Sequence, residues 1–210
     1  MLDEATIRDL LRPFALSLSS SQVSILLAYL DLLVRWNKKI NLTSIRSPEE
    51  AVTRHFGESL FLAQRLQLTG RLLDIGSGAG FPGLALHIVF PELQSTLLEP
   101  VAKKRAFLKE VARTCAFASV DVRPERLEDF ARLNPNPVFN SLTARAVGDH
   151  RSLVLEGAKL LRPGGRLCLW VGHEQGKLLG EYSNTIKWKE PAKIPMGTER
   201  EIWIGNYRPM

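Results

Sequence analysis

Cysteine, long apolar runs and clustered catalytic pairs are scarce or missing in this 210-residue sequence, and each absence excludes a class of protein. The two cysteines, Cys115 and Cys168, each stand alone among apolar neighbours, and two cysteines make neither a disulfide framework nor a metal cluster. No stretch approaches the ~20 apolar residues of a membrane span, and the acidic segment 1–4 lacks the profile of a signal peptide. We therefore expect a reduced, cytoplasmic protein that binds no metal and does not enter a membrane.

The charge balance is more informative than the rest of the composition. Hydrophobic residues make up 45% and charged residues 24%, which is typical of a globular protein and leaves the fold class open. Lysine and arginine number 28 against 22 acidic residues, which gives a net charge of +6. A basic excess favours nucleic acid or another anionic surface as the partner.

The first 65 residues have the pattern of helices. After a run of three serines, which supplies N-cap candidates, apolar residues over 23–34 follow the i, i+3, i+4, i+7 rule. The segment Ser47-Pro48-Glu49-Glu50 is a second start signal, with a capping serine, a proline at the first helical position and a glutamate at the third. We expect one helix from there towards residue 55 and another through residues 60–66.

From residue 71 short apolar strands alternate with helical segments. We expect strands over 72–75, 96–99, 119–122, 138–142 and 166–171, and helices over 84–89, 102–116 and 153–161. This alternation predicts an α/β fold with a parallel sheet covered by helices on both faces. Two further segments, 185–189 and 201–206, predict an antiparallel pair at the sheet edge, which brings the sheet to seven strands. The sequence thus divides into a helical extension, 1–65, and an α/β domain, 66–210.

A glycine-rich turn, Asp74-Ile-Gly-Ser-Gly-Ala-Gly-Phe-Pro-Gly83, follows the first strand, and Glu99 ends the second. In an open parallel sheet, ligands bind beyond the carboxyl ends of the strands, where this turn lies. Gly78, Gly80 and Gly83 satisfy G-x-G-x-x-G, the pattern that places a dinucleotide pyrophosphate at a helix start. Two other interpretations are a turn that binds S-adenosylmethionine and a purely structural turn that binds no ligand.

The carboxylate directly before the glycines distinguishes these ligands. Asp74 is unfavourable for an anionic ligand and favourable for a cationic one. S-adenosylmethionine carries a sulfonium and an amino group and no phosphate, and an acid at Glu99 is spaced to receive ribose hydroxyls. The pattern therefore favours S-adenosylmethionine, with Asp74, Gly76, Gly78 and Glu99 as its binding residues.

Four segments occur in an order that resembles the RsmG (GidB) family. They are Trp36-Asn-Lys-Lys-Ile-Asn-Leu-Thr-Ser44, Arg54-His55, the strand and turn over 72–83, and the segment 97–108. The resemblance covers nearly the whole chain. It implies a Rossmann-like class I methyltransferase that transfers a methyl group from S-adenosylmethionine to N7 of a guanine in 16S ribosomal RNA.

The resemblance also implies roles for single residues. Gly76 and Phe81 match cofactor-contacting positions, and the pair Leu127-Glu128 matches the residues that meet the adenine. Arg145 matches the arginine after the fourth strand, and we expect it to contact the cofactor or the guanine. Three positions depart from the family pattern. Glu58 stands where the family usually has aspartate, Ala144 where it has serine, and Val171 where it often has lysine.

Guanine N7 has a lone pair and no proton, so methylation there needs alignment rather than a general base. No catalytic residue is therefore assigned, and Arg145 and His55 are the candidates. Each has a plainer interpretation: a salt bridge for Arg145, and a cap or a buried hydrogen-bonded group for His55. Methylation of an amine or of cytosine C5 is disfavoured, because an N-P-P-Y tetrapeptide and a reactive cysteine are absent.

Clusters of basic residues predict the RNA surface. Lys38 and Lys39 lie near a helix end, and Lys103-Lys104-Arg105 opens a helix, where the helix dipole disfavours cations. Such a run favours contact with RNA phosphates over the alternative, a solvated surface. We expect a monomer whose partner is 16S ribosomal RNA or a small-subunit particle. Two rival functions remain, a nicotinamide oxidoreductase and a non-catalytic RNA-binding protein with a methyltransferase fold.

Overall fold

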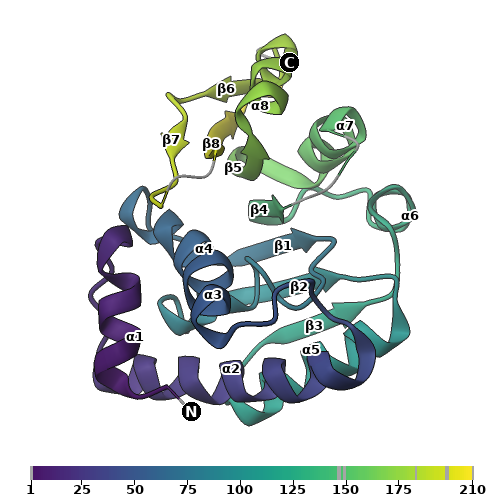
Figure 1. The fold of residues 1–210 in the computed structure, drawn as a ribbon. Coiled ribbons are helices and arrows are strands. Elements are labelled where there is room, and N and C mark those ends of the chain that lie inside the picture. Colours follow the sequence, from purple (N-terminus) through teal and green to yellow (C-terminus); the bar gives the residue numbers. More distant parts are fainter. Residues whose placement is uncertain (1, 146–147, 149, 183, 197–198, 210) are drawn as a thin grey trace.

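The computed structural model describes residues 2–145, 148, 150–182, 184–196 and 199–209 (Figure 1). Within these residues eight strands form one sheet in the order β3-β2-β1-β4-β5-β8-β6, with β7 paired to β8. Their bounds are β1 (Arg71–Ile75), β2 (Gln94–Leu98), β3 (Val120–Arg123), β4 (Phe139–Arg145), β5 (Leu161–Gly172), β6 (Ile186–Trp188), β7 (Ala192–Lys193) and β8 (Arg200–Tyr207).

The first five strands run parallel, and β8 is antiparallel to β5, β6 and β7. The predicted α/β class, the parallel sheet and the antiparallel edge are confirmed. The seven predicted strands are all present. The eighth, β7, has only two residues, too few to produce a readable alternation of apolar and polar side chains.

Helices cover both faces of the sheet. They are α1 (Glu4–Leu11), α2 (Ser20–Ile40), α3 (Pro48–Ala51), α4 (Glu58–Leu60), α5 (Ala102–Thr114), α6 (Leu127–Leu133), α7 (His150–Leu160) and α8 (His173–Leu179). Buried apolar residues of α1 to α5 belong to one core cluster, and those of α6, α7 and α8 belong to a second on the other face. Ser19 and Ser47 cap α2 and α3 by accepting backbone N–H groups, as the start signals predicted.

Two helical expectations were wrong in detail. The two helices expected between residues 48 and 66 form one run of helical turns, in which a π-helix (Val52–Gly57) and a 3₁₀ helix (Phe61–Gln64) adjoin α4. Gly57 lets this run pass close to Phe14, because a Cβ there would lie 2.5 Å from its ring. The helix expected over 84–89 is a 3₁₀ helix (Ala85–Ile88), which ends before Pro91 because a proline disfavours helical backbone in the residue before it.

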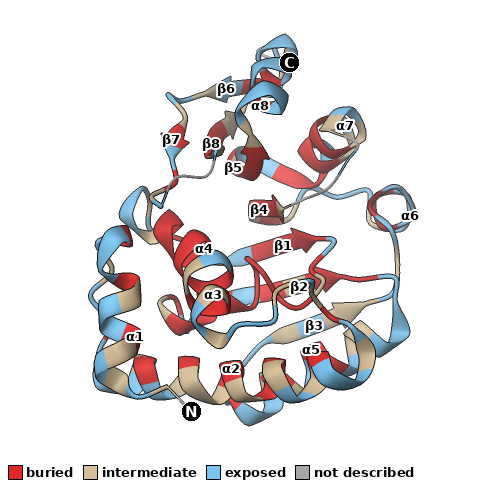
Figure 2. Ribbon diagram, in the orientation of Figure 1, coloured by how far each residue is buried: buried red, intermediate tan, exposed pale blue. Residues whose placement is uncertain are grey.

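The N-terminal helices share their core with the sheet. Tyr29 of α2, Phe56 of the π-helix, Phe81 of the glycine turn and Phe107 of α5 are all buried in the first cluster. Figure 2 shows the buried residues of these elements facing one another around β1 and β2. The division of the chain between residues 65 and 66 stays a prediction. In the described part of the chain, no helix combines the length and apolarity that crossing a membrane requires.

Candidate active site

The glycine turn connects β1 to the 3₁₀ helix and lies at the carboxyl end of the sheet. Gly76, Gly78 and Gly80 have φ values of 67°, 58° and 88°, a backbone region that side chains with a Cβ rarely adopt. A Cβ on Gly83 would lie 2.4 Å from Cβ of Asp74. The glycines are therefore required by the path of the backbone, as the sequence pattern indicated.

A cavity of about 400 Å³ opens beside this turn. Its wall is largely apolar, with Ile75, Leu98 and Leu127 among its residues, and it also contains Gly76 and Glu128. Of the residues predicted to bind the cofactor, Gly76, Leu127 and Glu128 thus line one space. The side chain of Glu128 also accepts a hydrogen bond from the hydroxyl of Ser152 on α7.

Asp74 lies behind the turn rather than in the wall of this cavity. Its side chain is fully buried, and Oδ1 accepts a 2.7 Å hydrogen bond from the hydroxyl of Thr143 on β4. Oδ2 is buried and has no hydrogen-bond partner among the described residues. Burial raises the pKa of Asp74 to about 6, against the hydrogen bond from Thr143, which lowers it. Asp74 therefore places a carboxylate behind the turn whose Oδ2 can still accept a hydrogen bond.

Glu99 supports the same turn from the end of β2. Oε2 accepts the amide of Gly78 and Oε1 accepts the amide of Val101, each at 2.8 Å. The carboxylate is buried, and its chain neighbours Pro100 and Val101 line the cavity. Gly78 and Glu99 thus act together in holding the turn.

Phe81 and Arg145 belong to a neighbouring cluster and not to the cavity wall. The ring of Phe81 lies 4.7 Å from that of His55 and 5.3 Å from that of Tyr29, nearly parallel to both. The guanidinium carbon of Arg145 lies 5.6 Å from the same ring. Phe81 is not among the residues that line this cavity, and the contact with a cofactor that the resemblance implied for it stays a prediction.

The two catalytic candidates are joined by a hydrogen bond. Arg145 donates to Nδ1 of His55 at 2.8 Å and to the carbonyl of Arg54 at 2.9 Å. Nε2 of His55 faces the hydroxyl of Thr43 at 2.9 Å, in the loop after α2. Because Nδ1 accepts, the proton sits on Nε2. Burial, with the nearby charge of Arg145, lowers the pKa of His55 to about 3, so the ring is neutral.

Asn37 fixes the loop that carries Thr43. Its side-chain oxygen accepts the amide of Thr43 at 2.9 Å, and its nitrogen donates to the carbonyl of Ile45 at 3.0 Å. Asn37 therefore holds the partner of His55 in place.

Sequence reasoning missed the acid at the centre of this cluster. Glu58 is buried, and its carboxylate lies 3.0 Å from a guanidinium nitrogen of Arg200, 3.7 Å from one of Arg145 and 3.9 Å from one of Arg54. Arg200 was assigned no role because it lies 142 residues away from Glu58 in the sequence. The sequence contained one indication of this role, because Glu58 stands where the family that the chain resembles usually has aspartate.

The basic residues predicted to bind RNA gather near the edge of the sheet where the glycine turn lies. Helices α2 and α5 pack antiparallel, since Ile25 meets Cys115 and Trp36 meets Phe107. The end of α2, with Lys38 and Lys39, therefore lies beside the start of α5, with Lys103 and Lys104.

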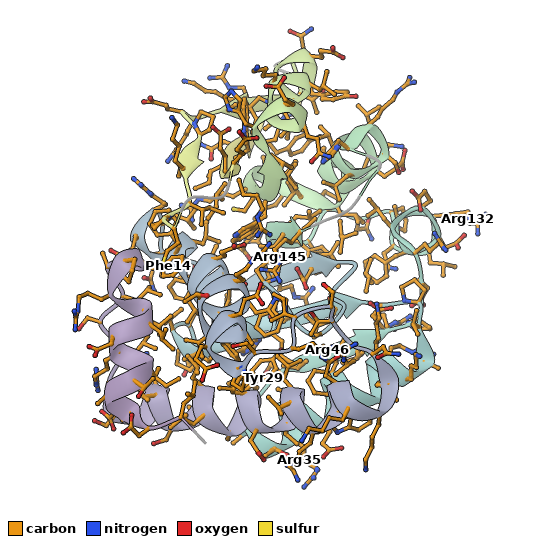
Figure 3. The ribbon with its side chains drawn as sticks, in the orientation of Figure 1. Phe14, Tyr29, Arg35, Arg46, Arg132 and Arg145 are labelled. Carbon is orange, nitrogen blue, oxygen red and sulfur yellow. The ribbon has the colours of Figure 1, made fainter. Side chains whose placement is uncertain are left out.

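Arg105 differs from its neighbours. Its guanidinium donates to the carbonyls of Glu99 and Pro100, so it braces the end of β2. Figure 3 shows Arg145 inside the molecule, whereas Arg35 and Arg132 point outward.

No group of three or more metal-ligating side chains occurs in the part of the chain that the structure describes.

Comparison with known proteins adds the following. A family model, GidB, described as rRNA small subunit methyltransferase G, matches residues 22–198. A Xylella fastidiosa (strain M23) protein named ribosomal RNA small subunit methyltransferase G is 43% identical over 167 residues, 78% of this chain and 77% of that protein. A protein of the same name from Xanthomonas campestris pv. campestris (strain 8004) is 42% identical over 164 residues, 77% of this chain and 76% of that protein.

A chain from the crystal structure of the fibrillarin/Nop5p complex superposes with a TM-score of 0.59 at 15% identity. The match covers 73% of the present chain and 82% of that chain. A likeness at this identity shows the fold alone. The Rossmann-like class I methyltransferase fold that the sequence predicted is confirmed.

Proposed function

The chain belongs to the GidB family, rRNA small subunit methyltransferase G, and from that membership we propose that it methylates N7 of a guanine in 16S ribosomal RNA with S-adenosylmethionine as the donor. The observation that carries the proposal is the cavity beside the glycine turn, with acids in its wall and behind it. Its volume of about 400 Å³ falls within the range of small-molecule sites.

The residues present fit S-adenosylmethionine better than a dinucleotide. Glu125 and Glu128 are in the wall, and the buried carboxylates of Asp74 and Glu99 lie behind the turn. One arginine, Arg126, is the only basic residue among those of the described chain that line the cavity. This balance suits a ligand with a sulfonium and an ammonium group and opposes two phosphates. The sulfonium, when bound, supplies a methyl group that is open to displacement by a nucleophile.

We assign the binding roles accordingly. Leu127 would pack against the adenine, Glu128 would accept a hydrogen bond from its edge, and Glu99 would receive the ribose hydroxyls. Gly76, which has no side chain, lets the ligand lie against the end of β1. Asp74 supplies negative charge behind the turn for the cationic end of the ligand. Gly78 holds the turn against Glu99 through its backbone amide.

We propose that the cluster around Arg145 binds the guanine of the substrate. Guanine N7 would use its own lone pair to bond the methyl carbon that the bound donor supplies, with the sulfur as leaving group taking the electrons of the broken bond. No proton moves, so His55 has no base chemistry to perform, and its neutral ring is suited to hold Arg145. A guanidinium can donate to guanine O6 and leave N7 free.

The substrate RNA docks, we propose, on the basic residues at the edge of the site. Lys38, Lys39, Lys103 and Lys104 contact phosphates, and Arg105 adds charge while bracing β2. The proposed location is the cytoplasm, where the substrate is found, and the proposed state is a monomer.

Product chemistry tests the proposal. Ribosomal RNA from a strain lacking this gene is incubated with the purified protein and S-adenosylmethionine, then treated with borohydride and aniline, which cleave at N7-methylguanosine. We expect one cleavage in 16S RNA that appears only with active protein. A folded protein that binds S-adenosylhomocysteine but produces no cleavage would support the non-catalytic rival. Binding of NADH in place of S-adenosylhomocysteine would support the oxidoreductase.

A further inference from the structure

Tyr29 lies where the N-terminal helices meet the glycine turn. Its side chain is completely buried on α2, and its hydroxyl donates a 2.6 Å hydrogen bond to the carbonyl of Ala79 inside the turn. Its ring stacks on Phe81 at 5.3 Å with an angle of 14° between the planes. Figure 3 places Tyr29 on α2, on the side that faces the rest of the molecule. One side chain of the helical extension thus contacts two residues of the turn.

The fit between Tyr29 and the turn leaves no spare room. A Cβ on Gly80 would lie 2.0 Å from the Tyr29 hydroxyl oxygen. Gly80 also has a φ of 88°, so the backbone there already depends on the absence of a side chain. The distance between the turn and α2 is therefore fixed by the Tyr29–Ala79 hydrogen bond and by the close contact of Gly80 with the Tyr29 hydroxyl.

The turn has a second support, and the two differ in what a ligand does to them. Glu99 holds the amide of Gly78 from the sheet side. In the function proposed above, the same carboxylate receives ribose hydroxyls, so ligand binding competes for its lone pairs. Neither Tyr29 nor Ala79 is among the residues that line the cavity, so we expect their hydrogen bond to be free of this competition. Burial also raises the pKa of Tyr29 well above its usual value, so its hydroxyl stays a donor.

We propose that Tyr29 is a positioning residue for the cofactor: it fixes the backbone of Ala79 to Phe81, so that the cavity is formed before the ligand arrives. This inference rests on the proposed function. It makes the helical extension a part of the cofactor site, in addition to any contact that the extension makes with RNA. Preorganisation of this kind improves affinity because the ordering cost is met during folding.

Tyr29→Phe tests the proposal, because it removes one hydroxyl and keeps the ring that fills the core. The matched control is Ser95→Ala, which removes another buried hydroxyl, bonded to His87 at 2.7 Å and remote from the turn. Calorimetric titration with S-adenosylhomocysteine should show roughly three- to tenfold weaker binding for Tyr29→Phe, the size of one lost hydrogen bond, and no change for Ser95→Ala.

Hydrogen exchange without ligand gives a second readout. The amides of Gly80 and Phe81 both donate to the carbonyl of Ser77, at 2.7 and 3.2 Å. In the wild-type protein we expect both to be protected before any ligand is added, and in Tyr29→Phe we expect them to exchange at least about fivefold faster. Wild-type amides that exchange as fast as an exposed loop would overturn the proposal, and that measurement needs no variant.

The outcomes separate this inference from the proposed function. Equal affinity of wild-type protein and Tyr29→Phe for S-adenosylhomocysteine, in two folded proteins, overturns the role of Tyr29 and leaves the proposed function intact. Failure of the wild-type protein to bind S-adenosylhomocysteine overturns the proposed function, while exchange at Gly80 and Phe81 still decides whether Tyr29 orders the turn. A lower melting temperature for Tyr29→Phe with unchanged affinity and exchange shows a merely structural residue, and also overturns the proposal.

Discussion

Arg145 donates a 2.8 Å hydrogen bond to Nδ1 of His55, and this contact decides what the histidine can do. The lone pair that would accept a substrate proton is already occupied by a guanidinium. The other nitrogen carries the proton and faces Thr43. With a pKa lowered to about 3 by burial and by Arg145, the imidazole stays neutral throughout the neutral pH range. His55 therefore acts on Arg145, as a fixed acceptor.

His55→Ala should lower the single-turnover rate up to about a hundredfold, the scale of a misplaced reacting group, and leave its pH profile flat. Between pH 6.5 and 8.5 the wild-type rate should also vary little, because N7 of guanine carries no proton in that window. Rates are measured with saturating RNA and S-adenosylmethionine. His87→Ala is the matched control, since His87 is also buried, with a pKa lowered to about 4 by burial, and it lies away from the site.

A wild-type rate that rises tenfold per pH unit, with a slope that disappears in His55→Ala, would make the histidine a general base. That outcome would also move the substrate atom from N7 to an amine or a hydroxyl.

Asp74→Asn should weaken binding of S-adenosylhomocysteine about ten- to hundredfold, because it removes the buried negative charge that we propose for the ammonium end of the ligand, and an interaction with a charged group contributes roughly 1.5–3 kcal/mol. Calorimetry on the folded variant measures the effect. The asparagine oxygen can still accept from Thr143, so the fold should survive. Unchanged affinity would show that Asp74 serves only the structure of the turn.

The same variant should change how stability depends on pH. The pKa of Asp74 is raised in the folded protein to about 6, from 3.8, so the folded state binds its proton more tightly than the unfolded state. That contribution to stability is complete below about pH 4 and is lost as the pH rises through 6, on the order of 3 kcal/mol. Asp74→Asn has no such group, so at pH 7.5 it should melt above the wild type. A variant that melts below the wild type at pH 7.5 and equally at pH 4 would contradict the assignment.

The sequence was sufficient for the sheet and for the turn because both depend on local patterns. Short apolar strands, a capping serine before Pro48 and glycines with positive φ can each be read within about ten residues. The cavity wall was found in the same way, through Gly76 and Leu127-Glu128. The limits of the 3₁₀ helix were missed because Pro91 acts on it from outside the apolar segment.

The second half of the site could not be read from the sequence, because its contacts join distant segments. Glu58, Arg145 and Arg200 lie at the start of α4, at the end of β4 and at the start of β8, and only the sheet order brings the last two together. Tyr29 looked like any core residue at helical spacing. Its hydroxyl acquires a role only because α2 packs against the turn 50 residues later.

Charge reversal at Lys103 and Lys104 tests the RNA surface. For single-stranded RNA the logarithm of affinity falls with the logarithm of salt concentration by about 0.7 for each phosphate contacted. Lys103→Glu/Lys104→Glu should flatten this slope and leave affinity for S-adenosylhomocysteine unchanged. Lys187→Glu/Lys189→Glu is the control, because it makes the same charge change on exposed residues of the far sheet edge. Equal slopes for both variants would mean that the basic run at α5 is an ordinary solvated surface.

Glu58→Gln should destabilise the protein more than any exposed charge neutralisation. The carboxylate is buried between Arg54, Arg145 and Arg200, and the side chain of Arg145 is only 12% exposed, so removing the acid leaves cationic groups without compensation. Loss of one partner from a buried ion pair costs about 3–5 kcal/mol. Glu174→Gln, which breaks an exposed pair with Lys177, should leave the stability nearly unchanged, because water and salt screen such a pair. Chemical denaturation at pH 7.5 measures both variants. Glu58→Asp keeps the charge, so it should recover most of the loss. If Glu58→Gln unfolds at the same denaturant concentration as Glu174→Gln, the three arginines do not depend on this acid and the cluster is held by its other hydrogen bonds.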